Sequence, residues 1–90
     1  MSENLQLSGA DLKVLLQVFK ANLYTLAIGL PEGTPYLYSG RSWKRARHLC
    51  QLGLLKLHEI NMTPPHESMV PVTITQDGIE AYNREISNNA

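Results

Sequence analysis

Residues 45–55 read Arg-Ala-Arg-His-Leu-Cys-Gln-Leu-Gly-Leu-Leu, and this stretch decides the fold of the chain. The segment that begins at Ser39 or Ser42 and ends at Gly53 has the spacing of an amphipathic helix. Gly53 stands where a residue in the left-handed conformation would close that helix. The apolar or small side chains expected on its inner side are Ser42, Ala46, Leu49, Cys50 and Gly53.

The outer side of this predicted helix is basic. No Asp or Glu occurs between Glu32 and Glu59, although the chain carries eight acids and eight Lys or Arg residues and is formally neutral. The cations in this interval are Arg41, Lys44, Arg45, Arg47 and Lys56. The outer side holds Arg41, Lys44, Arg47, His48 and Gln51, with Arg45 beside it. Segregating charge in this way costs self-repulsion, so the pattern indicates a surface that contacts an anion.

Two strands and a helix are expected to follow. Residues 54–60 and 70–75 alternate as strands, joined by a polar, Pro-rich turn over residues 61–69. Pro71 is expected at a sheet edge, where its missing N–H does no harm. Residues 76–86 have helical spacing, and residues 87–90 are expected to fray. The side chains expected to face inward are Val70, Val72, Ile74, Ile79, Tyr82 and Ile86.

A helix is expected before the basic segment as well. Residues 8–11 fit a capping box, with Asp11 in place of the usual glutamate. The helix ends near Asn22 or runs on to Ala27, and Tyr36-Leu37-Tyr38 could form a short strand. The face expected to be apolar contains Leu12, Leu15, Leu16, Phe19, Leu23 and Leu26. The core expected over the whole chain is Leu12, Leu15, Leu16, Phe19, Ala46, Leu49, Cys50, Leu55, Leu57, Val72, Ile74, Ile79 and Tyr82.

Composition is that of an ordinary globular protein, and residues 1–90 are expected to form one domain with flexible ends at 1–7 and 87–90. One cysteine excludes an internal disulfide, and no signal peptide or membrane span is visible, so a cytoplasmic protein is expected. The histidines lack metal-ligand spacing, and no phosphate loop or nucleophile motif occurs. Neither a metal, a cofactor nor an enzymatic activity is expected.

The order of these elements resembles a winged helix-turn-helix domain of the kind found in bacterial and phage transcriptional regulators. Residues 45–55 are similar to the end of a recognition helix that enters a wing hairpin, and residues 70–75 to the returning wing strand. Residues 74–82 are similar to the "L-T-x-x-G-x-x-A" start of the following helix. The resemblance implies an α+β domain of about three helices and a two-stranded antiparallel wing.

The chain departs from this family in two places. Residues 29–40 are rich in Gly and Pro, so the first helix of the helix-turn-helix pair is either residues 23–28 or missing. The wing tip carries no Lys or Arg and includes the acid Glu67. The polar wing residues that could contact DNA are Thr63, His66 and Ser68.

The resemblance implies that the basic helix binds the major groove of duplex DNA. Arg41, Lys44 and His48 would face the bases or phosphates, with Gln51 one turn further, and Arg45 and Arg47 would reach the backbones on either side. Four phosphate contacts would give a log–log salt slope of roughly −3 to −4. A homodimer on two half-sites is expected for useful affinity, through the first and last helices. The alternative is an adaptor or inhibitor whose basic face binds an acidic protein partner.

Overall fold

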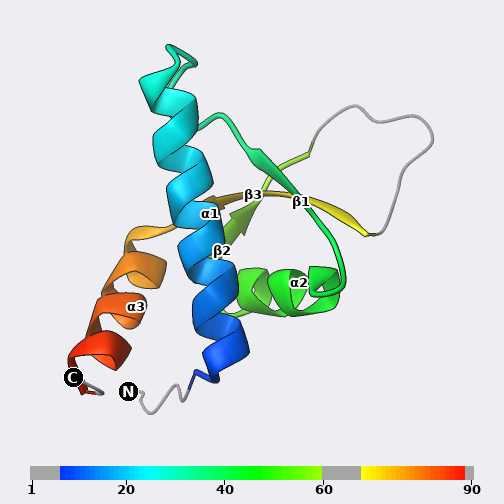
Figure 1. The fold of residues 1–90 in the computed structure, drawn as a ribbon. Coiled ribbons are helices and arrows are strands. Elements are labelled where there is room, and N and C mark those ends of the chain that lie inside the picture. Colours follow the sequence, from blue (N-terminus) through cyan, green and yellow to red (C-terminus); the bar gives the residue numbers. More distant parts are fainter. Residues whose placement is uncertain (1–6, 60–67, 89–90) are drawn as a thin grey trace.

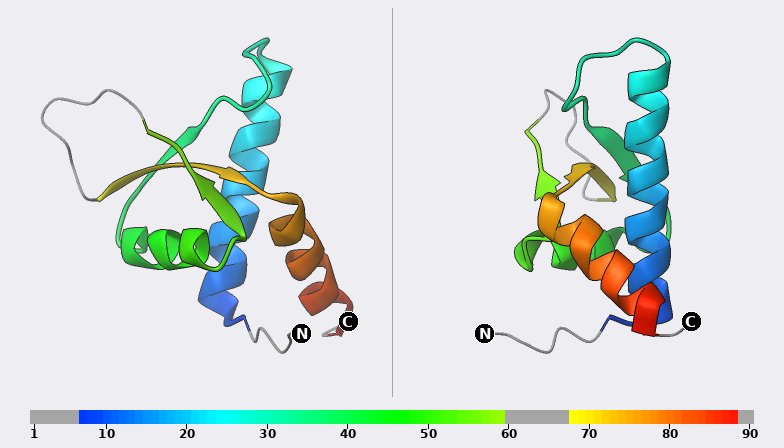
Figure 2. Two further views of the ribbon diagram at one scale, coloured as in Figure 1. Left: turned by 180° about the vertical axis from the view of Figure 1, so that it is seen from behind. Right: turned by 90° about the vertical axis from the view of Figure 1, so that its left-hand side faces the viewer.

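The computed structural model describes residues 7–59 and 68–88, which form three helices and one antiparallel sheet (Figure 1). The expected α+β class is confirmed, but the sheet has three strands rather than two, in the order β1-β3-β2. Helices α1 and α3 lie side by side, and α2 lies beside the first half of α1 (Figures 1 and 2). The elements in chain order are α1 (Gly9–Ala27), β1 (Tyr36–Ser39), α2 (Trp43–Gln51), β2 (Leu55–Leu57), β3 (Met69–Ile74) and α3 (Gln76–Asn88).

Helix α1 begins with the predicted capping box and runs without a break to Ala27. The Ser8 hydroxyl accepts from the Asp11 backbone N–H at 3.2 Å, and the Asp11 carboxylate accepts from the Ser8 N–H at 2.9 Å. The buried apolar side of α1 is made of Val14, Leu15 and Val18, rotated from the expected face. Because apolar residues occur on nearly every side of this helix, their spacing alone could not fix which side turns inward.

The predicted hairpin is confirmed over its described part. Leu55 pairs with Ile74, and Leu57 pairs with Val72, in an antiparallel register. Strand β2 is shorter than expected and ends at Leu57, while Ile60 and the turn residues 61–67 lie outside the described residues. Leu55 is buried in the core, whereas Leu57, on the same side of the strand by alternation, is exposed.

The third strand, β1, pairs with the other side of β3, with Tyr36 opposite Val72. The prediction that Pro71 lies at a sheet edge is therefore wrong, because β3 is the central strand. The Pro71 carbonyl accepts from the His58 N–H at 2.8 Å, on the β2 side. Since the N–H and C=O of one strand residue point to the same neighbour, the missing N–H also faces that side, where β2 has already ended.

The core lies between the helices and the sheet. Of the predicted core residues, Leu15, Ala46, Leu49, Leu55 and Val72 are buried, and most others are half-buried. Two inward assignments are wrong, since Leu57 is 47% exposed and Ile86 is 45% exposed. Helix α3 also continues through Ser87, which was expected to fray. The buried side chains that the pattern did not predict as core are Val14, Val18, Tyr38, Leu54 and Ala81, and Val70, which was expected only to face inward, is also buried.

A tight junction joins the end of α2 to the start of α3. The Thr75 hydroxyl accepts from the Gly78 backbone N–H at 3.0 Å. It shares its own proton between two carbonyl oxygens, that of Gly53 at 2.8 Å and that of Leu54 at 3.0 Å. A Cβ at Gly78 would collide with the Leu54 carbonyl oxygen. Gly53 has φ of 83°, the left-handed conformation expected from the sequence. The Thr-x-x-Gly spacing thus fixes α3 against the turn that follows α2.

Candidate nucleic-acid interface

Helix α2 is held by its inner side. Ala46 and Leu49 are fully buried, and α2 packs on β2, β3 and α1. The helix follows β1 after only the link Gly40-Arg41-Ser42, and Ser42 makes no side-chain cap hydrogen bond. With nine residues, α2 is about 13 Å long, and its outer side is left without a covering element among the described residues.

The predicted outer residues follow one stripe along α2 and the turn before it. Arg41, Lys44, His48 and Gln51 are exposed, at a spacing of three or four residues. Arg47 belongs to the same side but is half-buried. These five residues are called the α2 basic face below.

Trp43 supports two of these cations. The Lys44 Nζ lies 5.6 Å from the centre of the indole ring, and the Arg47 guanidinium carbon lies 6.0 Å from it. Trp43 is half-buried and packs against the core cluster that includes Tyr38. Cation–π contact of this kind restrains both long side chains at the surface.

Arg45 makes a contact within the fold that the sequence did not predict. Its guanidinium Nη1 donates to the Asp11 carboxylate at 2.8 Å and to the Ser8 hydroxyl at 3.4 Å, so it binds the first turn of α1. Burial alone raises the pKa of Asp11, but the hydrogen bonds from Arg45 and Ser8 outweigh it and the pKa is lowered. Reversal of the Arg45 charge would therefore disturb the fold as well as the basic surface. The only feature of the sequence that indicated a partner for Arg45 was Asp11, the acidic residue of the predicted capping box.

Lys56 lies on the other face of the sheet from the α2 basic face. Leu57 lines a shallow depression with Arg47, Cys50 and Gln51, so Lys56 and His58 point the opposite way by strand alternation. The His58 ring lies 2.8 Å from the Thr73 hydroxyl, and burial together with Lys56 lowers its pKa. The five cations of residues 33–58 therefore lie in three places. Arg41, Lys44 and Arg47 belong to the α2 basic face, Arg45 contacts the first turn of α1, and Lys56 lies on the opposite face of the sheet.

The wing residues Thr63 and His66 lie outside the described residues. Ser68 is half-buried just before β3. Cys50 is half-buried on the inner side of α2, and burial raises the pKa of its thiol despite nearby Arg47, so the thiol stays protonated at neutral pH. Within residues 7–59 and 68–88, no helix combines the length and apolar character needed to cross a membrane.

No separate helix precedes α2 in residues 28–42, where the helix-turn-helix family has one. All of residues 28–42 are described, and they contain β1 and turns but no helix. Residues 23–27 are the end of the continuous helix α1, not a separate element. The helix-turn-helix pair of the family that the sequence resembles therefore lacks its first member here.

Comparison of the chain with protein families, with curated proteins and with solved structures finds no match. The functional conclusion therefore rests on the charge and geometry of the α2 basic face.

Proposed function

We propose that the chain binds duplex DNA through the α2 basic face, as a small sequence-specific transcriptional regulator. The observation that carries the proposal is an exposed stripe of Arg41, Lys44, His48 and Gln51 along α2 and the turn before it, opposite the fully buried side chains of Ala46 and Leu49. No acid occurs from residue 33 to residue 58, so the stripe meets no repulsion from its own segment when it approaches phosphates.

The dimensions and side chains of α2 support this use. A helix with its side chains is about 10–12 Å across, and the major groove is about 12 Å wide. Gln51 has the amide geometry that pairs with adenine, and Arg41 can pair with guanine through two hydrogen bonds. Lys44 and Arg47, restrained by Trp43, are suited to phosphates.

A second candidate is binding to an acidic protein partner through the same face. It is favoured by the absence of a helix in residues 28–42, because the family uses that helix to cross the DNA backbone. A formal net charge of zero also gives little long-range attraction to nucleic acid. The two candidates share the contact surface and differ in the polyanion.

Fluorescence anisotropy with a mixed-sequence duplex at low salt separates the two. The test variant combines Arg41→Glu with Lys44→Glu, and the matched control combines Lys13→Glu with Arg84→Glu, which are exposed cations of α1 and α3. We expect wild type and control to bind, and the test variant to lose affinity by at least about tenfold. Failure of wild type to bind the duplex, with binding of polyglutamate through Arg41 and Lys44, would replace DNA by an acidic protein.

A further inference from the structure

One exposed leucine of β2 lies directly beside the α2 basic face. Leu57 is 47% exposed, and it lines a depression of ≈ 270 Å³ together with Arg47, Cys50 and Gln51. Arg47 and Gln51 belong to the α2 basic face, so the depression is continuous with that face. Leu57 and the half-buried Cys50 form its apolar wall. The α2 basic face therefore has an apolar margin on the side of β2.

The place of Leu57 in the strand explains which way its side chain points. Leu57 pairs with Val72, which is fully buried in the central strand, and it lies on the same side of β2 as the buried Leu55. Its side chain therefore points to the side of the sheet that carries α2, yet stays open to solvent. Exposed leucines are common at protein surfaces, so the exposure alone indicates no ligand. The neighbours of Leu57 do, because two of them are proposed DNA contacts.

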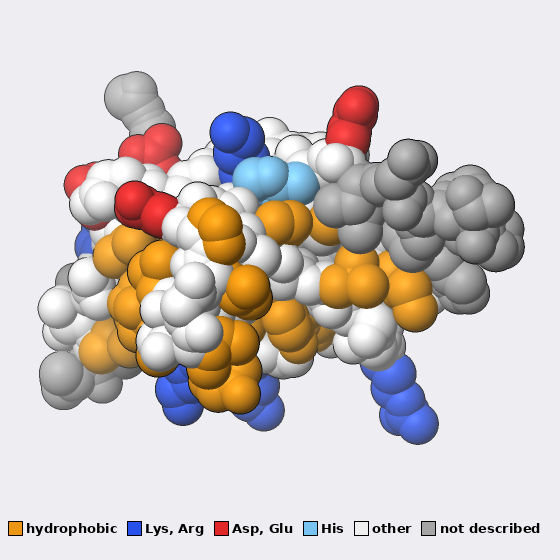
Figure 3. Space-filling view, turned by 90° about the horizontal axis from the view of Figure 1, so that it is seen from above, with side chains coloured by type: hydrophobic (Ala, Val, Ile, Leu, Met, Phe, Trp, Pro, Cys, Tyr) orange, Lys and Arg blue, Asp and Glu red, His pale blue; other side chains and the backbone are white. Residues whose placement is uncertain are grey.

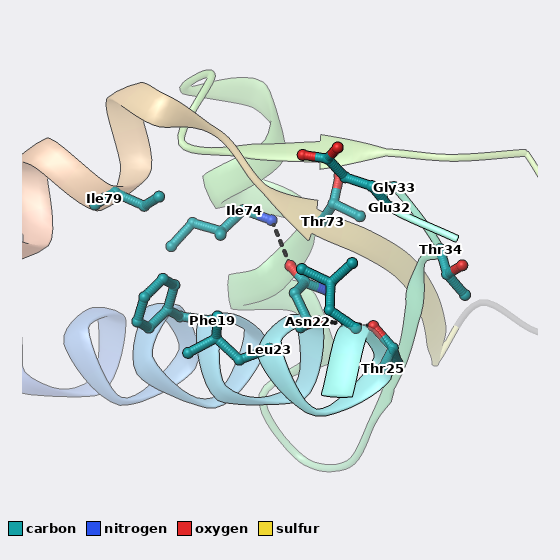
Figure 4. A pocket seen from close by; sticks show the side chains of 11 residues that line it. Phe19, Asn22, Leu23, Thr25, Glu32, Gly33, Thr34, Thr73, Ile74 and Ile79 are labelled. Carbon is teal, nitrogen blue, oxygen red and sulfur yellow. Dashed lines mark hydrogen bonds between the residues drawn. The ribbon is translucent and has the colours of Figure 1, made fainter. Parts of the chain in front are cut away.

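The exposed apolar side chains at the end of α1 have different neighbours. Hydrophobic side chains gather over this end of the molecule (Figure 3), and a groove beside them lies between α1, β3 and α3 (Figure 4). The charged side chain that lines this groove is Glu32, which would repel a polyanion. The depression at Leu57 is lined by Arg47 instead. It is therefore the depression at Leu57 that suits an anionic ligand with an apolar group.

Duplex DNA offers such a group where α2 is proposed to bind. The base edges in the major groove carry hydrogen-bonding atoms and one kind of apolar group, the methyl group of thymine. An A·T pair presents this methyl group in the same groove as the adenine atoms with which a glutamine side chain pairs. Gln51 and Leu57 line one depression, the first with an amide and the second with an apolar side chain. Together they match both features of an A·T pair.

We propose that Leu57 contacts a thymine methyl group when α2 lies in the major groove, which makes Leu57 a residue that determines sequence specificity. The proposal rests on the function proposed for α2. Leu57 adds no attraction to phosphate, so its contribution to affinity depends on the base that it meets. Covering one methyl group with an apolar side chain corresponds to a change of about fourfold in affinity. Contact with deoxyribose would show no such dependence on the methyl group.

A duplex that differs only in its methyl groups tests this contact. Wild type first selects tight-binding duplexes from a pool with a randomised centre. One enriched duplex is then synthesised in two forms, with thymidine or with deoxyuridine at every thymine position. Fluorescence anisotropy gives the dissociation constants of both forms for wild type, Leu57→Ser and Leu37→Ser.

Leu37→Ser is the matched control. Leu37 is 38% exposed, and it pairs with Pro71, so its side chain lies on the opposite face of the sheet from Leu57. Thermal unfolding followed by circular dichroism checks that both variants fold. The selection and the comparison of the two duplex forms by wild type need no variant, so they decide the matter even if Leu57→Ser does not fold.

We expect the enriched duplexes to contain A·T pairs, and wild type to bind the thymidine form about fourfold more tightly than the deoxyuridine form. Leu57→Ser should bind both forms alike, and Leu37→Ser should keep the preference. Enriched duplexes without thymine overturn the proposal, as does equal binding of both forms by wild type. A preference that Leu57→Ser retains in full overturns it too. Absence of binding to any duplex is a different result, because it refutes the function proposed for α2 and this inference with it.

Discussion

The Arg45 guanidinium of α2 lies 2.8 Å from the Asp11 carboxylate of α1, and this ion pair joins the basic helix to the first turn of the N-terminal helix. Asp11 also accepts from the Ser8 N–H, so one carboxylate both caps α1 and anchors α2. Its side chain is 13% exposed, whereas that of Arg45 is 42% exposed. The consequence is that one cation of the 41–47 segment acts within the fold.

We therefore expect Arg45→Glu to destabilise the protein and Lys44→Glu to leave its stability nearly unchanged. Reversal at Arg45 leaves the poorly exposed Asp11 carboxylate beside a second negative charge, which costs about 1–3 kcal/mol. The lower end of this range applies, because solvent screens the exposed side of Arg45. Urea unfolding measures both variants, and equal midpoints would show that the ion pair contributes nothing.

Asp11 also makes stability depend on pH. Its pKa lies below the ordinary value of 3.8 in the folded protein, so the unfolded chain takes up its proton first as the pH falls. The stabilisation is complete above about pH 4 and decreases as the pH falls from 3.8 through the folded pKa. The difference in unfolding free energy between wild type and Asp11→Asn should therefore shrink on acidification. A difference that stays constant from pH 6 to pH 2.5 would contradict this assignment.

The junction at Gly78 predicts an asymmetry between two helical glycines. A Cβ at Gly78 meets the Leu54 carbonyl oxygen, which belongs to the backbone and cannot turn away, so Gly78→Ala should cost about 1–3 kcal/mol. Gly9 has nothing within 4 Å of the added atom, so Gly9→Ala should be neutral or stabilise by up to about 1 kcal/mol. Chemical denaturation of the two variants compares them directly, and equal effects would show that Gly78 is not closely packed.

Leu49 and Leu52 provide a second comparison, between a buried residue of α2 and the exposed residue that caps its C-terminus. Leu49 is fully buried, and Leu49→Ala should cost roughly 2–5 kcal/mol, because it loses transfer energy and leaves a cavity. Leu52 is 39% exposed, so Leu52→Ala should cost well under half as much. Thermal unfolding of both variants is the measurement. A larger loss at Leu52 would mean that the orientation of α2 about its axis is wrong.

Features set by neighbouring residues could be predicted from the sequence. The capping box of Ser8 and Asp11, the left-handed Gly53 and the pairing of residues 55–57 with 72–74 all follow from local rules of spacing and backbone conformation. The exposed positions of Lys44, His48 and Gln51 follow in the same way from the buried side of one short helix.

Features set by distant residues could not be predicted. Pro71 lies in a central strand because β1 pairs with the free side of β3. The alternation of residues within β1 or β3 does not indicate the order of the strands in the sheet. Arg45 forms an ion pair with Asp11, which lies 34 positions away in the sequence, and is therefore not part of the α2 basic face. Leu26 is exposed although it continues an apolar face, since α1 extends beyond the elements that cover its first half.

The salt dependence of duplex binding tests the central claim most directly. With Arg45 occupied by Asp11, at most three cations of the 41–47 segment can contact phosphates, which predicts a log–log slope no steeper than about −3, smaller than four contacts would give. Lys44→Gln should reduce that slope by about one, and Lys13→Gln on α1 should leave it unchanged. Anisotropy titrations of the three proteins over a range of salt concentrations give the slopes. Absence of duplex binding at low salt, or a slope that responds to Lys13 and not to Lys44, would contradict DNA binding by α2.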